Sequence, residues 1–257
     1  MRKVLLFLFF LTVLPGVAKA TSCSGNGCVQ FIPTNTTSGT KITATAITPT
    51  AGNTVVLIGA ALGSGTSGTA TVSGGGQTWH PCSGTGTGAF TMIQINTTTV
   101  LGFCFYILNA LAVSTAAVVT PSNCSCSFLG ASSTEYSASA ANVWDQFGSN
   151  SLKTTTAGTQ NLNCTAANVT PAVSNEVAFC AGLPNSGPCA NTGTGTLRDG
   201  ASTGFCTMDQ TVSAAFTAKI TDSAGSGDTY GAMIILFKPS GGAASQFSQI
   251  SVIPGNP

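Results

Sequence analysis

Charged residues are scarce in this chain of 257 residues. It has eight Lys and Arg and seven Asp and Glu, which is 6% charged residues against roughly a quarter in soluble domains. Three of the basic residues lie in the first twenty positions, so the other 237 residues carry five basic against seven acidic groups, a net charge of −2. Five scattered cations cannot supply clustered phosphate contacts, which excludes a nucleic-acid partner. An apolar content of 43% excludes a disordered chain.

The residue types that build metal and catalytic sites are also sparse. There is one histidine, His80, and no Cys-x-x-Cys pair, so we expect no metal and no cofactor. Glycosidases need two carboxylates across a cleft, whereas here the acidic residues stand singly at turns or strand ends. Whether the protein is an enzyme stays open at this point, and the composition favours a protein that is not. The acidic residues after position 20 are Glu135, Asp145, Glu176, Asp199, Asp209, Asp222 and Asp228.

Long apolar runs are lacking after residue 20. The first twenty residues combine Arg2 and Lys3, an apolar stretch over 4–13 and the small-x-small site Ala18-Lys19-Ala20. This pattern predicts a signal peptide, residues 1–20, cleaved after Ala20. No later run reaches the length of a membrane span, so we expect a secreted or cell-surface protein, extracellular or periplasmic. Lipid attachment at Cys23 is an alternative that Ala20-Thr21-Ser22 disfavours, since a bulky aliphatic residue is expected three positions before such a cysteine.

All ten cysteines follow the predicted cleavage site, and an even number in an exported chain predicts up to five disulfides. The first pairings to test are Cys23 with Cys28 and Cys82 with Cys104. Cys124 and Cys126 are so close in sequence that we expect each to bond elsewhere. The disulfide candidates are Cys23, Cys28, Cys82, Cys104, Cys124, Cys126, Cys164, Cys180, Cys189 and Cys206.

Short alternating runs rich in Val, Ile, Thr and Phe, separated by Gly, Pro, Asn and Ser, predict strands and turns. Residues 138–147 contain the one candidate for a helical turn. The expected strands cover residues 41–47, 54–62, 89–95, 101–108, 115–120 and 127–136.

Two segments of the first half recur later in the chain. ITPTAGNTVVLIGAA, from Ile47, matches VTPAVSNEVAFCAGL, from Val169, at an offset of 122. FCFYILNALAVSTAAV, from Phe103, matches FCTMDQTVSAAFTAKI, from Phe205, at an offset of 102. Two matches in the same order predict two related sets of strands, each too small to bury its apolar sheet face alone.

We therefore predict an all-β fold: a two-sheet, jelly-roll-like sandwich built from two related halves and stapled by disulfides. The expected organisation is a signal peptide (1–20), an N-terminal arm (21–40), one β-sandwich domain (41–240, with halves at about 41–148 and 162–240) and a C-terminal tail (241–257).

The motifs SGGGQTW (73–79), TEYS (134–137), GTLRD (195–199), TMDQ (207–210) and YGAMIILFKP (230–239) resemble a recurrent domain of secreted bacterial proteins, related to modules of phage and surface proteins. The resemblance covers most of the mature chain and implies a β-sandwich surface domain without an assigned reaction. The chain departs from the pattern by its larger number of cysteines. The resemblance supplies no catalytic residues.

Three residues are candidates for ligand binding: Trp79, His80 and Glu135. A histidine beside a tryptophan can stack on a sugar, although both more often belong to a strand end or a core rim. Glu135 lies in an apolar strand and needs a partner, such as Arg198 or backbone donors, so its first interpretation is a structural hydrogen-bond anchor. Trp144 is interpreted as a core or rim residue.

Other motifs have weaker context. Gly200–Gly204 matches Gly-x-Ser-x-Gly around Ser202, but the following residues favour a strand where a nucleophile elbow needs a helix. Asp222 and Asp228 flank a loop that matches no calcium-binding consensus. Asn-x-Ser/Thr sequons matter only if the host glycosylates; they occur at Asn35, Asn96, Asn123, Asn163 and Asn168.

The hypothesis from sequence is a secreted, non-catalytic surface or extracellular module with structural or binding function. Its partners would be glycans, cell-surface components or other copies of the chain, since sparse charge opposes association only weakly. The alternatives are a carbohydrate-binding, lectin-like domain and a secreted hydrolase.

Overall fold

A computed structural model describes residues 21–64, 69–83, 89–95, 98–153, 158–163, 169–183, 190–191, 195–199, 206–213, 219–224 and 229–240. No helix occurs among these residues, and the strands pair antiparallel in four sheets. The predicted signal peptide and the tail 241–257 lie outside them. The all-β, disulfide-bonded sandwich expected from the sequence is confirmed, but with four sheets in place of two.

Residues 21–136 form a large and a small sheet. Sheet I has the strand order β1-β2-β10-β4-β8-β6, with β7 also paired to β8, and sheet III has the order β3-β9-β5. The expected arm, residues 21–40, contains β1 and β2, so it is part of sheet I. The bounds are β1 Thr21–Ser22, β2 Cys28–Gly39, β3 Ile42–Thr43, β4 Thr54–Ser64, β5 Ala70–Ser73, β6 His80–Pro81, β7 Ala89–Ile95, β8 Thr98–Ile107, β9 Val118–Pro121 and β10 Ser125–Tyr136.

Residues 143–238 form a second pair of sheets. Sheet II has the order β11-β18-β13-β16-β15 and sheet IV has the order β12-β17-β14. The helical turn considered for residues 138–147 is limited to a turn after Ser137, and a strand starts at Val143. The bounds are β11 Val143–Lys153, β12 Gly158–Asn163, β13 Glu176–Leu183, β14 Ala190–Asn191, β15 Thr196–Asp199, β16 Cys206–Val212, β17 Lys219–Ala224 and β18 Thr229–Lys238.

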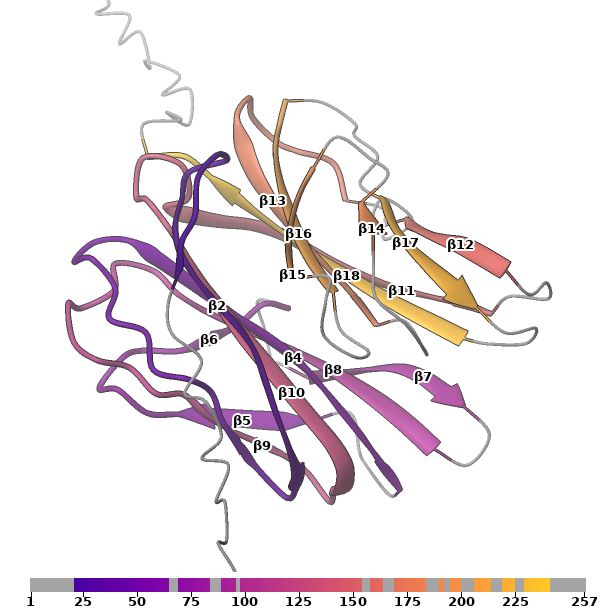
Figure 1. Ribbon diagram of the computed structural model, residues 1–257. Coiled ribbons are helices and arrows are strands. Elements are labelled where there is room, and N and C mark those ends of the chain that lie inside the picture. Colours follow the sequence, from indigo (N-terminus) through magenta and orange to yellow (C-terminus); the bar gives the residue numbers. More distant parts are fainter. Residues whose placement is uncertain are drawn as a thin grey trace, which may run out of the picture.

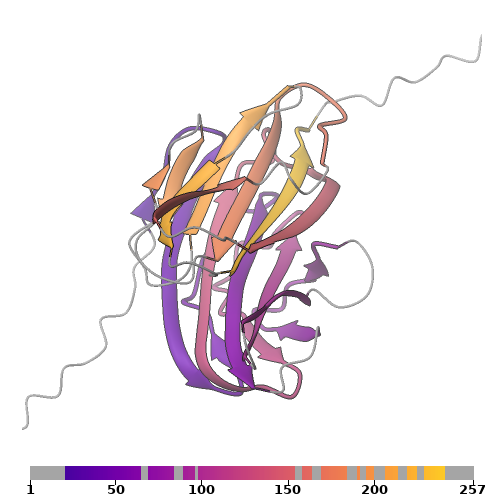
Figure 2. The ribbon, with the colours of Figure 1, turned by 90° about the vertical axis from the view of Figure 1, so that its right-hand side faces the viewer.

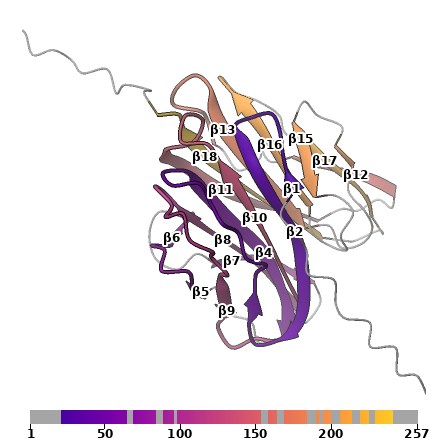
Figure 3. The ribbon, with the colours of Figure 1, turned by 60° about the vertical axis from the view of Figure 1, so that its left-hand side comes forward.

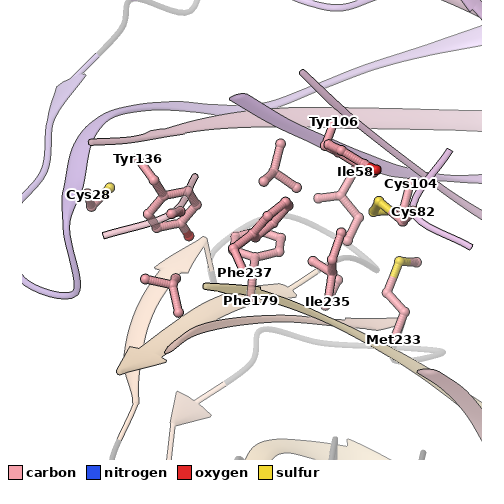
Figure 4. Packing of buried hydrophobic residues seen from close by; sticks show 14 of the residues in the cluster. Cys28, Ile58, Cys82, Cys104, Tyr106, Tyr136, Phe179, Met233, Ile235 and Phe237 are labelled. Carbon is pink, nitrogen blue, oxygen red and sulfur yellow. A yellow bond between two sulfur atoms is a disulfide. The ribbon is translucent and has the colours of Figure 1, made fainter. Parts of the chain in front are cut away.

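The four sheets are stacked, with sheets I and II in the middle (Figures 1 and 2). The largest buried cluster lies between them, where Ile58 and Tyr106 of sheet I meet Phe179, Ile235 and Phe237 of sheet II (Figure 4). A second cluster joins the other face of sheet I to sheet III, and a third lies on the other face of sheet II. Figures 1 and 3 place sheet IV on the side of sheet II away from sheet I.

The central strands alternate in side-chain direction and are buried on both sides. In β4, Val56 and Ile58 face sheet II, whereas Leu57 and Ala61 face sheet III. This explains why β4 reads as a continuous apolar run, because both faces of its sheet are covered. Each fully buried Val, Leu or Ile side chain contributes about 1.5–3 kcal/mol to the free energy of folding.

The sequence offset of 122 aligns the first residues of β4 and β13 but exchanges their faces. At this offset Leu57, which faces sheet III, is matched to Phe179, which lies between sheets I and II. An offset of 123 matches Phe179 to Val56, which lies in that same cluster. A slip of one residue moves every side chain of a strand to its other face, which accounts for the difference.

The turns before the two strands agree with the longer offset. Gly52 has φ 87° and Asn175 has φ 63°, and these left-handed residues stand 123 positions apart at the same place in a two-residue turn. Glycine and asparagine are the residues that tolerate this conformation.

Three disulfides are defined within the described chain. Cys23–Cys28 and Cys82–Cys104 are bonded as predicted. The expectation for Cys124 and Cys126 is wrong, because they bond each other. Asn123, with φ 53°, precedes them in a tight turn, and their Cα atoms lie 5.1 Å apart, within the usual disulfide range. Cys180 and Cys206 are disulfide-bonded as well, while Cys164 and Cys189 lie outside the described residues.

Candidate functional site

Glu135 is fully buried in β10 and is surrounded by amide donors. Its Oε1 accepts hydrogen bonds from the backbone N–H of Thr50 (2.8 Å) and from the side-chain amide of Asn53 (2.6 Å). Its Oε2 accepts one from the side-chain amide of Gln30. Such donors stabilise an ionised carboxylate away from water. Glu135 therefore anchors β10 to β2 and to the turn before β4, without Arg198.

Trp79 and His80, at the start of β6, point to different faces of sheet I. The Trp79 ring is half-buried against clusters on the face toward sheet III, and its Nε1–H donates to the carbonyl oxygen of Gly74 at 3.3 Å. The exposed His80 ring stacks on Tyr106, whose ring lies in the cluster between sheets I and II, with ring centroids 5.3 Å apart. Because Glu135 is buried and β4 and β8 separate β10 from β6, the three predicted binding residues do not line one exposed surface.

Two loops, residues 74–79 and 108–115, are joined by hydrogen bonds, and we call them together the tip. The side-chain amide of Gln77 donates to the carbonyl oxygen of Leu111 (2.9 Å), and its Oε1 accepts from the Leu111 N–H (3.0 Å). This two-way pairing holds one loop to the other as a strand partner would. Leu111 and Val113 are 55% and 43% exposed, so the tip presents two apolar side chains to solvent in a chain of low charge.

A buried ion pair joins the N-terminal loop to sheet II. Arg198 in β15 binds both carboxylate oxygens of Asp209 in β16, at 2.7 and 2.8 Å, and the Asp209 side chain is 0% exposed. The same guanidinium donates to the carbonyl oxygens of Ser24 (2.9 Å) and Gly25 (3.1 Å). Planar guanidinium is suited to this forked geometry, whereas lysine is not.

Two more side chains complete the surroundings of Asp209. Asn26, in the loop that the Cys23–Cys28 disulfide closes, donates to Oδ1 at 2.7 Å. The Tyr136 hydroxyl, from β10, donates to Oδ2 at 2.9 Å. Burial, then the Asp209 charge and this hydrogen bond, raise the pKa of Tyr136 well above its usual 10.0. This group, which we call the clasp, connects residues of the first pair of sheets to the second.

Three charged residues meet near one end of sheet II, on three neighbouring strands: Asp145 of β11, Lys238 of β18 and Glu176 of β13. Lys238 Nζ lies 2.6 Å from Asp145 Oδ1, with the two side chains 28% and 7% exposed. The register between β11 and β18 shifts at Asp145, so that Trp144 pairs with Phe237 and Gln146 with Leu236. Such a bulge redirects the side chain of the extra residue, here Asp145.

Glu176 is fully buried beside this pair. Its Oε1 accepts from the backbone N–H of Val173 at 2.6 Å, while Oε2 has no hydrogen-bond partner among the described residues. Burial raises the pKa of Glu176, and the neighbouring Asp145 carboxyl raises the pKa further; the backbone donors of Val173 and Ala172 oppose this. Ionised carboxylates only accept, so a hydrogen bond between the two requires a shared proton.

Sequence reasoning missed this three-residue group and the clasp. Asp145 and Glu176 are 31 positions apart and Lys238 is 62 further on, so only strand pairing brings them together. Trp144 is confirmed at the rim of the core, with its Nε1–H donating to the carbonyl oxygen of Cys82 at 2.9 Å. Ser202, Asp228 and the side chain of Asp222 lie outside the described residues.

Comparison of the sequence with protein-family models and with curated proteins gives no match. Within the described residues, no group of three or more His, Cys, Asp and Glu side chains is placed to hold a metal ion. The same part of the chain contains no helix with the length and hydropathy of a membrane span.

Proposed function

We propose that this protein is a secreted, non-catalytic module of the cell exterior with a structural or binding function. The observation that carries this proposal is the use of charge inside the fold. Glu135 anchors three segments, Asp209 and Arg198 join two pairs of sheets, and Asp145 pairs β11 with β18 through Lys238. Charged groups committed in this way hold strands together and leave little charge for a substrate.

The disulfides support a location outside the cytosol. Bonded cysteines persist in oxidising surroundings outside the cytosol, and the described cysteines are all bonded. The predicted signal peptide, residues 1–20, supplies the export route.

The proposal includes an architecture of two related jelly-roll-like sandwiches. With β1 and β7 left out, each set of eight strands has the order first, eighth, third, sixth, fifth in its large sheet and second, seventh, fourth in its small sheet. Identical orders in consecutive sets support the duplication of one ancestral unit.

The tip is the surface that we assign to partner contacts. Its loops are fixed by Gln77, so that exposed Leu111 and Val113 are presented without a cost of ordering a mobile loop. Whether the partner is a cell-surface component or a second copy of the chain is decided by the experiment below.

The test combines location with binding. Fractionation of the producing cells should find the chain in the extracellular or surface fraction, with its N-terminus after Ala20. The purified mature chain should bind its own copies or isolated cell envelopes, and Leu111→Ser/Val113→Ser should weaken this at least tenfold, with Thr120→Ser as an exposed control.

Three results would contradict the proposal. The first is a cytoplasmic chain that keeps residues 1–20, and the second is hydrolysis of an ester or glycoside substrate that Ser202→Ala abolishes. The third is saturable binding on a glycan array that Trp79→Ala and His80→Ala remove, which would favour the lectin-like alternative.

A further inference from the structure

The contact between Lys238 and Asp145 places an amine against a carboxyl group. Nζ and Oδ1 are 2.6 Å apart on neighbouring antiparallel strands, and Asp145 is largely shielded from water. An amine held against a carboxyl group in a fixed geometry reacts with a high effective concentration. Lys238 and Asp145 therefore form an ion pair, and they are also placed as a nucleophile (the Nζ amine) and an electrophile (the carboxyl carbon) would be.

The burial of Glu176 beside Lys238 and Asp145 is not explained by an ion pair alone. One lysine and one aspartate already balance in charge, and a second buried carboxyl group beside them adds an unfavourable negative charge unless it holds a proton. Its Oε2 is buried with no donor among the described residues, and its neighbour is the Asp145 carboxyl. A proton held between the two carboxyl groups satisfies both and lies next to the atoms that would react.

Charged residues are scarce in this chain, and three of them are grouped here. Residues 21–257 include five basic residues, and one of them is placed with two of the seven acidic residues at the same end of sheet II. The bulge at Asp145 brings its side chain to this group at the expense of regular pairing.

We propose that Lys238 and Asp145 form an intramolecular amide bond, with Glu176 carrying the proton for the reaction. This inference does not depend on the proposed function.

The step needs no further reagent. The Lys238 ammonium gives a proton to a carboxylate that contacts it, and the electron pair of the neutral Nζ attacks Cγ of Asp145. The proton between Glu176 and Asp145 neutralises the oxygen charge that develops at Cγ. The attacking nitrogen then gives one of its two protons to Glu176, which delivers it to the departing hydroxyl. As water leaves, Glu176 takes the proton of the remaining hydroxyl, whose oxygen becomes the amide oxygen. The N–C bond forms, the C–O bond breaks, one water leaves, and Glu176 returns to its initial state.

The product would join the first and last strands of the second set. Residues 145 and 238 enclose nearly the whole of sheets II and IV, so the bond would hold β11 and β18 together when the rest of the set opens. Cross-links that close long loops restrict the unfolded chain most strongly.

The test is the intact mass of the mature protein after reduction and denaturation. We expect a mass lower by one water than that calculated for the linear chain from its sequence, and a digest that contains residues 145 and 238 in one linked peptide. A wild-type mass equal to that of the linear chain would overturn the proposal, and so would a lost water located elsewhere in the chain.

Variants assign the roles without relying on stability. Lys238→Arg keeps the charge but not the amine and should restore the full mass, as should Glu176→Gln when it is folded by circular dichroism. Lys41→Arg, at an exposed position, should keep the loss of water. Retention of the linked peptide in Glu176→Gln, at the wild-type rate of formation, would contradict the role of Glu176.

Discussion

The buried charged residues of this protein have defined hydrogen-bond partners, and Asp209 in the clasp is an example. Asp209 receives donors from Arg198, Asn26 and Tyr136, which come from three parts of the sequence. A buried charge that keeps all its donors is tolerated, whereas one that loses its counter-ion is strongly unfavourable.

Arg198→Met should lower the free energy of unfolding by about 3–5 kcal/mol, because Asp209 would remain buried without its counter-ion. Urea denaturation measures this. Arg198→Met/Asp209→Asn should regain part of the loss by removing the unpaired charge. A double variant as unstable as the single one would show that the charge is not the cause.

The raised pKa of Tyr136 predicts that the folded protein loses stability at alkaline pH. Its pKa in the folded protein is raised well above 10.0, so the folded state keeps a proton that the unfolded chain loses as the pH rises. The stabilisation is complete below 10.0 and declines as the pH rises from 10.0 toward the folded-state pKa. Unfolding by urea at a series of pH values should show this decline, and Tyr136→Phe should reduce it. An unchanged decline in Tyr136→Phe would assign it to other groups.

At single residues, the sequence predicted the role of a side chain where that role depends only on its immediate neighbours in the chain. Glu135 was expected to be a hydrogen-bond anchor because a carboxylate in an apolar strand needs donors, and Thr50, Asn53 and Gln30 supply them. Its donors could not be named from sequence, since they lie 85, 82 and 105 positions away. The clasp and the Lys238 group were missed for the same reason.

At the scale of single strands, β4 depends on a glycine at its centre. A Cβ at Gly59 would overlap the carbonyl oxygen of Gly130 and the ring of Phe103, its partner in β8. Both neighbours are fixed in the middle of sheet I, so neither can move away without loss of packing.

Gly59→Ala should therefore destabilise the protein by about 3 kcal/mol, at the upper end of the range for overpacking. The control is Gly76→Ala, where φ is 63° but no atom lies near the added carbon, and about 1–2 kcal/mol is expected. Thermal unfolding compares the two. A smaller loss for Gly59→Ala than for Gly76→Ala would contradict the packing of β4 against β8.

The disulfides differ in the length of chain that they close. Removal of Cys82–Cys104, with a separation of 22, should cost about 3 kcal/mol, and removal of Cys124–Cys126, with a separation of 2, about 1 kcal/mol. Double alanine variants of each pair, compared by urea denaturation, measure this difference. Equal losses would indicate that loop closure does not set the contribution of these bonds.

Strand positions were predicted well where alternation and turn residues are strong. The expected strand 89–95 coincides with β7, and the expected strand 54–62 differs from β4 by two residues at one end. The internal match at an offset of 122 places residues of different sheet faces opposite each other, because short apolar runs look alike in both registers. The positive φ of Gly52 and Asn175 favours an offset of 123, and this feature of the backbone is not visible in the apolar pattern.

For the whole molecule, the sequence predicted an all-β sandwich with disulfides but not the number of layers. The Thr, Ser and Asn content of residues 21–40 predicts an arm, yet β2 pairs along nearly all of β10. Polar strands at a sheet edge carry no apolar period, so their pairing is visible only in three dimensions. In the resulting stack, the largest apolar cluster lies between sheets I and II.

Amide hydrogen exchange of the wild type and of Phe179→Ala tests whether sheets I and II share one core. Phe179 lies in sheet II, but its ring is buried between sheets I and II, against Tyr136 of β10. If the two sheets share one core, the loss of about 3–5 kcal/mol expected for this truncation should reduce protection in β4 and β10 of sheet I together with β13 and β18. Faster exchange confined to β13, β16 and β18, with β4 and β10 unchanged, would contradict a shared core.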